Sequence, residues 1–194
     1  MATVRVSLTG TQPLILHNGR LANPLDPHTR EMKALTGKRG KTDDDLALLM
    51  MVEAEGAAYE TPEGYIGLPD ANIWRSLNEA AKAYKRGKDI SRAVIYDPER
   101  IAPVAIEGEL VPVKDFLQRE GAIDYRPVGV MGKKTMRARP IIHNWAVSCD
   151  FEVYTDILMV QDLEQMLDRA GRLEGVGDHR PQYGRYTATV QEVS

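Results

Sequence analysis

The side chains best suited to chemistry in this chain are lysines and arginines gathered in a few short stretches. Ammonium and guanidinium groups bind phosphate, and guanidinium can do so through two parallel hydrogen bonds. Because phosphates repeat along a nucleic-acid strand, several cationic stretches on one protein favour binding to the strand's backbone. Taken singly, each stretch is more typical of a solvated surface. The residues that we expect to contact phosphate are Lys33, Lys38, Arg39, Lys41, Lys133, Lys134, Arg137, Arg139, Arg180 and Arg185.

One of these stretches lies between two segments with the composition of strands, residues 125–131 and 136–142. The intervening residues 132–135 read Gly-Lys-Lys-Thr, so we expect a β-hairpin whose tip carries Lys133 and Lys134. Such an arm can grip a phosphate backbone. An ordinary hairpin kept soluble by lysine fits the same residues, because lysine protects exposed strand edges. The sequence leaves both interpretations open.

Residues 171–185 form a glycine-rich segment between a predicted helix and a predicted strand. A dinucleotide-binding loop would instead follow a strand and open a helix. Glycines allow close approach of the backbone to a ligand, Arg180 and Arg185 offer phosphate contacts, and Tyr183 or His179 offers a ring for stacking. The alternative is a helix cap followed by a tight turn, for which Gly171 alone suffices.

Motifs for metal binding and for most enzymes are absent from the sequence. The four histidines are not spaced like metal ligands, and the single cysteine, Cys149, cannot build a structural zinc site. No Ser-His-Asp order and no phosphate-cradling loop with its lysine is present. We therefore expect no metal and no cofactor, and we do not expect an enzyme.

The bulk composition is that of one globular domain. The chain has 194 residues, of which 43% are hydrophobic and 27% charged, and its formal net charge is −3. Because that net charge offers no general attraction to phosphate, a nucleic-acid interpretation depends on where the cations lie. With one cysteine, no signal-peptide pattern and no apolar run of membrane-spanning length, we expect a soluble cytoplasmic protein that does not bind membranes.

Stepwise alternation of apolar and polar residues predicts the strands. Residues 3–9, 147–154 and 185–190 each follow the two-residue period of a half-buried strand. Residues 101–106 predict a fourth strand, in which Pro103 suggests an edge position or a bulge. In this pattern Cys149 is a small buried hydrophobic residue.

Capping residues and apolar stripes predict three helices. One begins with Asp70 as cap, presents a stripe ending in Tyr84 and stops at Gly87. Another begins with Asp162 and stops at Gly171. The third, opened by Thr42 and Asp45 and stopped by Gly56, is an inserted element. A further basic group closes the first of these helices: Lys82, Lys85, Arg86 and Lys88.

Without the inserted helix, the elements follow the order strand, helix, strand, strand, helix, strand. This order predicts an α+β fold with a ferredoxin-like, RRM-like βαββαβ core. Two insertions interrupt it, at about residues 17–65 and 108–145, within one domain spanning residues 1–194. Both are longer than a connection requires, and long loops on a rigid sheet often carry function.

The chain resembles the RAMP proteins, and among them the backbone subunits of CRISPR effector complexes and their stand-alone homologues carried by phages. The resemblance rests on residues 8–19, which follow the first predicted strand, and on residues 66–77, which enter the first helix. It rests also on the glycine-rich segment. Together these motifs cover most of the predicted core in order, although each is short.

The resemblance implies an RRM-like core with a thumb hairpin, binding of single strands by their backbone, and side-by-side assembly of subunits into a homo-oligomer or filament. By position, Arg75 matches the basic residue after the family's turn before the helix, and Lys133 and Lys134 would lie on the thumb. The turn itself, residues 70–72, departs from the family's small residues and lysine. The aromatic signature of sequence-reading RRM proteins is also missing, which argues against base readout.

Our leading hypothesis is therefore a cytoplasmic protein, in the host cytoplasm if a phage encodes it, that binds single-stranded DNA or RNA with little sequence preference. One alternative is a metal-independent endoribonuclease of the RAMP type, in which Asp26 orients a 2′-hydroxyl and His17 or His28 moves a proton. Yet Asp26 stands between two prolines, as turn residues often do. The other alternative is an assembly protein without nucleic acid.

Overall fold

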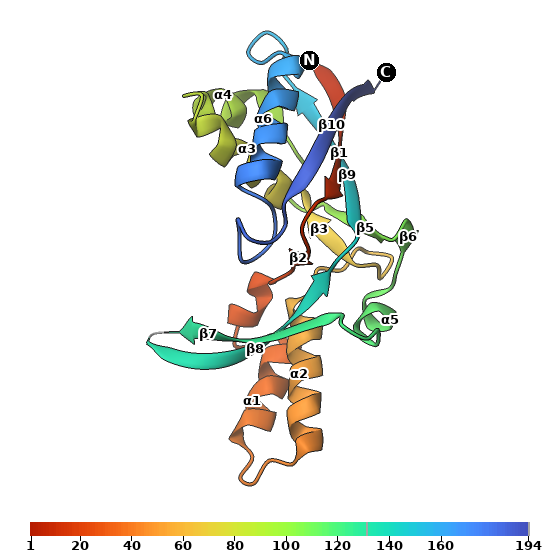
Figure 1. Cartoon of the computed structure of the whole chain (residues 1–194), viewed down its shortest axis with the longest axis vertical. Coiled ribbons are helices and arrows are strands. Elements are labelled where there is room, and N and C mark those ends of the chain that lie inside the picture. The colour runs from red at the N-terminus through yellow and green to blue at the C-terminus, as the bar shows by residue number, and fades with distance from the viewer. Residues whose placement is uncertain (131, 194) are drawn as a thin grey trace.

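The computed structural model describes residues 1–130 and 132–193, without the side chains of Val130 and Lys133. Its larger sheet has seven strands, and five of them lie side by side in the order β10, β1, β9, β5, β3, with antiparallel neighbours throughout (Figure 1). The short strands β4 and β6 pair with β9 and β5. The bounds are β1 Ala2–Gly10, β3 Gly67–Pro69, β4 Val94–Ile95, β5 Ile101–Ile106, β6 Glu109–Leu110, β9 Trp145–Val153 and β10 Tyr186–Val193.

The predicted strands are confirmed. In β1 the alternating residues Val4, Val6 and Leu8 are at most 1% exposed, as a strand with one face on the core requires. Cys149 lies opposite Val6 and is buried, and burial raises the pKa of its thiol, so it is a core residue. Pro103 does not lie on an edge strand. It stands where β5 changes partner from β3 to β9.

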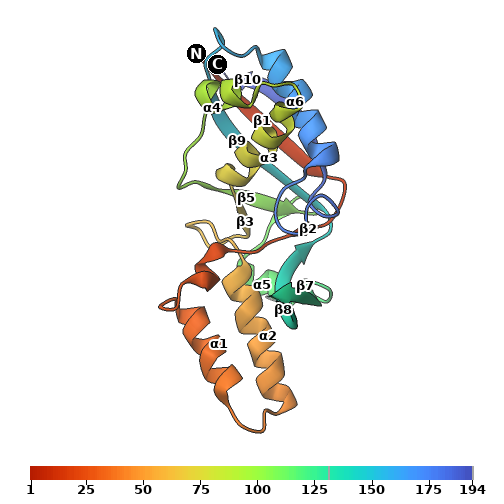
Figure 2. The same ribbon diagram turned by 90° about the vertical axis from the view of Figure 1, so that its left-hand side faces the viewer.

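Two helices, α3 (Asp70–Lys82) and α6 (Val160–Leu173), cover one face of the larger sheet (Figure 2). Their apolar stripes, which include Leu77 and Leu167, are buried against the sheet. A short helix, α4 (Gly87–Ala93), follows α3 after a turn. The remaining face of the sheet carries polar side chains, among them Arg5 and Ser7.

The predicted helix ends were partly wrong. Asp70 is not a cap but the first residue of α3, completely buried and paired with Arg100 at 3.0 Å. Asp162 likewise lies inside α6, where it accepts a hydrogen bond from Arg86 instead of capping the helix. In both cases an arginine that is distant in the sequence binds the carboxylate, which the local sequence had predicted to be a helix cap.

Helix α3 also ends earlier than predicted, at Lys82, and Tyr84 beyond it is 47% exposed instead of buried. Helix α6 continues past Gly171 to Leu173. A Cβ atom at Gly171 would lie 2.1 Å from the carbonyl oxygen of Tyr186, so this glycine lets α6 pack closely on β10 and does not end the helix.

The two predicted insertions pack on each other at the end of the molecule away from the chain termini (Figure 1). Thr42 and Asp45 form the predicted capping box of α2. Helix α2 packs against α1 and against strand β8 of a three-stranded sheet in the order β2, β8, β7. The bounds are β2 Leu14–Ile15, η1 Gly19–Ala22, α1 Pro27–Gly37, α2 Asp43–Ala57, α5 Val113–Leu117, β7 Ile123–Val130 and β8 Lys133–Ile142.

Candidate nucleic-acid interface

The predicted hairpin is confirmed and its tip is shorter than expected. Strands β7 and β8 pair up to Val130 opposite Lys133, and Lys134 lies opposite Gly129. The two lysines therefore begin β8 and do not form the turn. Met131 and the side chain of Lys133 lie outside the described residues, whereas Lys134 is exposed. The hairpin projects from the body of the molecule as an arm (Figure 1).

At the base of the hairpin, a network of ion pairs joins it to the glycine-rich segment. Arg139 is 3% exposed and donates to Asp124 at 3.1 Å and to Asp178 at 2.7 Å. Desolvation acts to raise the pKa of Asp178, but hydrogen bonds from the His179 N–H and from Arg139 outweigh it, and the pKa is lowered. Arg139 thus holds the fold together and is not available to a ligand.

Tyr183 belongs to the same network. Its hydroxyl accepts a hydrogen bond of 2.8 Å from Arg126, whose guanidinium also lies over the ring at 4.8 Å from the centroid. His179 meets the ring edge-on, with 6.2 Å between centroids. Because Arg126 covers one face of Tyr183, the ring connects the hairpin to the glycine-rich segment.

Sequence reasoning missed Asp124 and Arg126. The signal was present in the register of the hairpin, because Asp124 faces Arg139 across β7 and β8. Asp124 also accepts a hydrogen bond from Arg126, two residues along the same strand. Opposite charges at cross-strand positions indicate pairing within the hairpin before they indicate a ligand.

The glycines of the segment serve its own folding. Gly175, Gly177 and Gly184 have positive φ, and a Cβ atom at Gly184 would lie 1.8 Å from the carbonyl oxygen of Val176. One at Gly177 would lie 2.5 Å from the carbonyl oxygen of Ile15. The close approach that these glycines allow is to the chain itself, and neither a phosphate contact nor a simple cap at Gly171 explains them.

Two arginines of this segment were predicted to bind phosphate, and one of them is exposed and makes no ion pair within the described residues. Arg185 donates through Nε to the carbonyl oxygen of Pro181 at 2.7 Å, within the loop. Arg180 is exposed, and its charge acts on the buried phenol of Tyr186, which is hydrogen-bonded to Ser76 of α3 at 3.0 Å. The loop that carries Arg180 therefore leads into a strand whose first residue contacts the second turn of α3.

Arg75 is exposed on the same part of α3. Burial raises the pKa of the Tyr59 phenol, and the charge of Arg75 opposes that rise. The Tyr59 hydroxyl donates to the carbonyl oxygen of His17 at 3.3 Å, and the N–H of Asp178 donates to the carbonyl oxygen of Ile15 in β2 at 2.8 Å. The start of α3, the chain after β2 and the glycine-rich segment thus meet at one place.

The cations of the first insertion divide into two groups. Lys38 pairs with Asp45 at 2.6 Å, and Lys41 donates to the carbonyl oxygen of Lys38. With Arg39 they form the turn between α1 and α2, at the opposite end of the molecule from the termini (Figure 1). Lys33, in contrast, lines a cavity of about 360 Å³ together with Arg137 of the hairpin.

Five of the predicted residues therefore lie where the base of the hairpin, α1, the start of α3 and the glycine-rich segment approach one another, and we call this surface the convergent face. Arg137 shares its charge there with Glu53, at 2.8 Å. The members are Lys33, Arg75, Arg137, His179 and Arg180. Lys134 lies further out, on the hairpin arm that adjoins this face, opposite Gly129.

Asp26, the weak catalytic candidate, is the N-cap of α1. Its Oδ1 accepts hydrogen bonds from the N–H groups of His28 and Thr29 at 2.9 and 3.3 Å. Desolvation opposes them, yet the two bonds lower its pKa. This structural role accounts for the position between two prolines. Among the described residues, no group of three or more His, Cys, Asp or Glu side chains could hold a metal.

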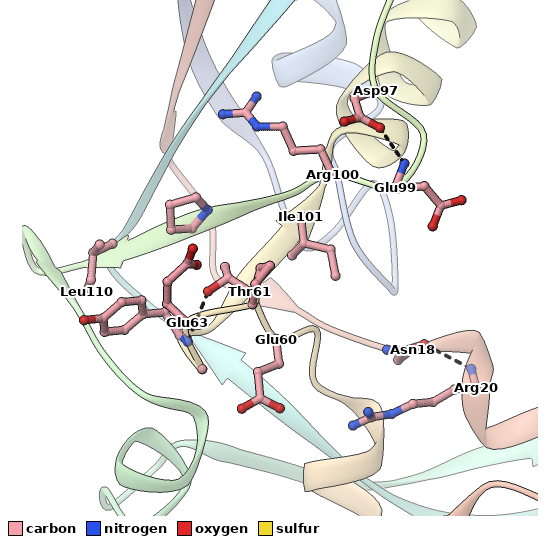
Figure 3. A pocket seen from close by; sticks show the side chains of 14 residues that line it. Asn18, Arg20, Glu60, Thr61, Glu63, Asp97, Glu99, Arg100, Ile101 and Leu110 are labelled. Atoms are coloured by element: carbon pink, nitrogen blue, oxygen red, sulfur yellow. Dashed lines mark hydrogen bonds between the residues drawn. The ribbon is translucent and has the colours of Figure 1, made fainter.

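A cavity of about 990 Å³ shares no lining residue with the convergent face. Figure 3 shows that its walls carry Glu60, Glu63, Asp97 and Glu99. Of its two cations, Arg20 donates to the carbonyl oxygens of Glu55 and Gly56, and Arg100 pairs with buried Asp70. A cavity whose carboxylates outnumber its cations repels phosphate.

Across residues 1–130 and 132–193, no helix has the length and apolar character needed to cross a membrane. The function is inferred from the geometry of the convergent face. No protein-family model and no curated protein sequence matches the chain.

Proposed function

We propose that this protein binds single-stranded nucleic acid through its phosphates, on the convergent face. The observation that carries the proposal is that Arg75 and Arg180 come from separate parts of the chain and are exposed on this face, while Lys134 is exposed on the hairpin arm that adjoins it. None of the three has an ion-pair partner within the part of the chain that the structure describes. Unpaired cations on adjoining elements provide the electrostatic track that a phosphate backbone requires.

Binding through the backbone, with little sequence preference, fits the surroundings of the aromatic residues. One face of the Tyr183 ring is covered by Arg126, which leaves it poorly placed to stack on successive bases. The sheet face without helices carries polar pairs, such as Arg5 with Asp150 and Ser7 with Ser148, instead of aromatic rings. Neither region offers the stacking surface by which RRM proteins read bases.

A ferredoxin-like core of the RAMP type is part of the same proposal. The antiparallel order β10, β1, β9, β5, with α3 connecting β1 to β5 and α6 connecting β9 to β10, is consistent with the predicted βαββαβ arrangement. The hairpin β7–β8 then takes the position of the thumb.

We also propose that subunits assemble side by side along the strand. The hairpin extends beyond the body of the subunit and exposes Tyr125 and Met136, by 50% and 41%, which supports contacts to a neighbouring copy. The buried, unpaired Cys149 is compatible with a reducing compartment such as the cytoplasm.

Fluorescence anisotropy with labelled single-stranded DNA, single-stranded RNA and duplex DNA tests this function. We expect single strands of unrelated sequence to bind alike and affinity to fall steeply as salt rises. Electron micrographs of the same complexes test assembly, and intact RNA after incubation with excess protein would remove the ribonuclease alternative. Assembly without affinity for any oligonucleotide would instead favour the assembly-protein hypothesis.

A further inference from the structure

A second basic surface lies at the corner between α3 and α4, apart from the convergent face. An open pocket of about 710 Å³ occupies this corner. Four of its lining residues are cationic and none is acidic, in a chain of net charge −3. This is the reverse of the cavity of about 990 Å³, where carboxylates predominate. The lining residues are Asn78, Lys82, Lys85, Gly87, Lys88, Ser91 and Arg92.

Three of the four cations lack an anionic partner. Lys82 pairs with Glu79 at 2.6 Å, but Lys85, Lys88 and Arg92 make no ion pair within residues 1–130 and 132–193. Lys88 and Arg92 are four residues apart on α4, so their like charges lie on the same side of the helix and destabilise it. An anion bound between them would remove that repulsion.

The backbone at Lys85 adds a second sign of specialisation. The N–H of Arg86 bonds to the carbonyl oxygen of Ala81, and the N–H of Lys85 to that of Lys82, which together form a Schellman motif. Lys85 occupies the left-handed position of the motif with φ of 59°, where glycine is favoured. Lysine at this position costs conformational free energy that glycine would not, and Lys85 lines the pocket.

Hydrogen bonds of Arg86 hold the corner in place on the side that faces α6. Arg86 donates to Asp89 at 2.9 Å, to Asp162 at 2.5 Å and to the carbonyl oxygen of Ile157 at 3.0 Å. These contacts fix α4 relative to α6, so the pocket cations are positioned before a ligand arrives. Asn78 contributes a side chain whose Oδ1 has no hydrogen-bond partner among the described residues, and turning its amide would present a donor there.

From these observations we infer that the corner is a separate anion site that binds compounds with two or three linked phosphates. A single phosphate would compensate only part of the charge of Lys85, Lys88 and Arg92, whereas linked phosphates can contact all three. The described residues that line the pocket include no aromatic ring, so recognition is of the phosphates and not of a base. The site is separate from the convergent face, because Arg75 on that face precedes Lys82 by seven residues, which is about 10 Å along α3.

Isothermal titration of the full chain with tripolyphosphate at low salt tests the inference. We expect saturable binding that Lys88→Ala/Arg92→Ala weakens about tenfold or more. The matched control is Lys114→Ala/Arg119→Ala, which removes the same charge from exposed residues on and after α5 and should leave the affinity unchanged. Equal thermal midpoints for the variants would show that both are folded.

Two further measurements separate this site from the proposed function. Affinity of Lys88→Ala/Arg92→Ala for a single-stranded oligonucleotide should stay within about twofold of the unmodified protein. ATP and tripolyphosphate should bind alike. The inference is overturned if tripolyphosphate does not bind, if the control variant loses as much affinity, or if the pocket variant loses oligonucleotide affinity instead. Because the tripolyphosphate titration contains no nucleic acid, failure of the proposed function would not affect it.

Discussion

The base of the hairpin and the convergent face beside it contain the same kinds of side chain in opposite electrostatic settings. At the base, Arg126 and Arg139 are each held by carboxylates, and Arg139 is almost completely buried. On the convergent face, Arg75 and Arg180 are exposed and unpaired within the described residues. The comparison teaches that a cluster of arginines in the sequence mixes structural and ligand-binding roles, and that burial separates them.

The largest expected effect on the free energy of unfolding comes from a substitution that removes the ion pairs at the base of the hairpin. Arg139→Ala leaves Asp124 and Asp178 without their shared partner, and removing one member of a buried ion pair costs about 3–5 kcal/mol. Urea unfolding followed by circular dichroism measures this free energy. Lys134→Ala is the control, since it should change stability by less than about 0.5 kcal/mol. Equal losses would mean that the buried and exposed cations do not differ as described.

A pH titration sharpens the comparison at Asp70, whose burial is less fully compensated. Both oxygens of Asp124 are paired, but Oδ1 of Asp70 has no partner among the described residues. Desolvation outweighs Arg100 and raises the pKa of Asp70 from 3.8 to about 6. Because the folded state then binds the proton more tightly, stability should fall by up to about 3 kcal/mol as pH rises from 4 to 6.

Asp70→Asn removes the group that titrates. The thermal midpoint of this variant, followed across the same pH range, should lose that fall and exceed the midpoint of the unmodified protein above pH 6. A variant with an unchanged pH profile would show that Asp70 is not the source.

The glycine-rich segment gives the next effect. Gly184→Ala places a Cβ atom at positive φ and 1.8 Å from a backbone oxygen, which should cost about 2 kcal/mol or more. At Gly37, where φ is not positive and nothing lies within 4 Å, the same substitution meets no obstacle and serves as the control. Chemical unfolding measures both. If Gly184→Ala were as stable as Gly37→Ala, the loop would not be packed on itself as described.

The smallest effect tests the role of Tyr183. Tyr183→Phe removes the hydroxyl that accepts from Arg126 and keeps the ring, so stability should fall by about 1 kcal/mol. Oligonucleotide affinity should not change, because the ring connects parts of the chain. A clear loss of affinity with unchanged stability would show that Tyr183 contacts the nucleic acid.

The sequence was sufficient to predict the four long strands of the larger sheet, the hairpin and the α2 capping box, because these follow from local periodicity and short-range hydrogen bonds. It missed the short strands β2, β3, β4 and β6. It failed at Asp70 and Asp162, where arginines distant in the sequence bind carboxylates that resemble caps. It also failed to separate Arg139 from Arg180, since only the folded chain brings Asp124 and Asp178 to the former.

The predicted cations of the first insertion show the same limit. Lys38, Arg39 and Lys41 are as basic as Lys33, but the length of α1 carries them to the far end of the molecule. Whether a basic residue joins the convergent face depends on helix packing, which the charge pattern does not encode.

The salt dependence of single-strand binding tests the central claim most directly. Lys134→Ala/Arg180→Ala should bind unrelated single strands more weakly than the unmodified protein. Its plot of log affinity against log salt should be flatter by about 0.7 for each phosphate that the variant no longer neutralises. Lys114→Ala/Arg119→Ala, with the same change in charge, should keep both the affinity and the slope. Identical slopes for the two variants would contradict a phosphate-binding role for the convergent face and the hairpin arm that adjoins it.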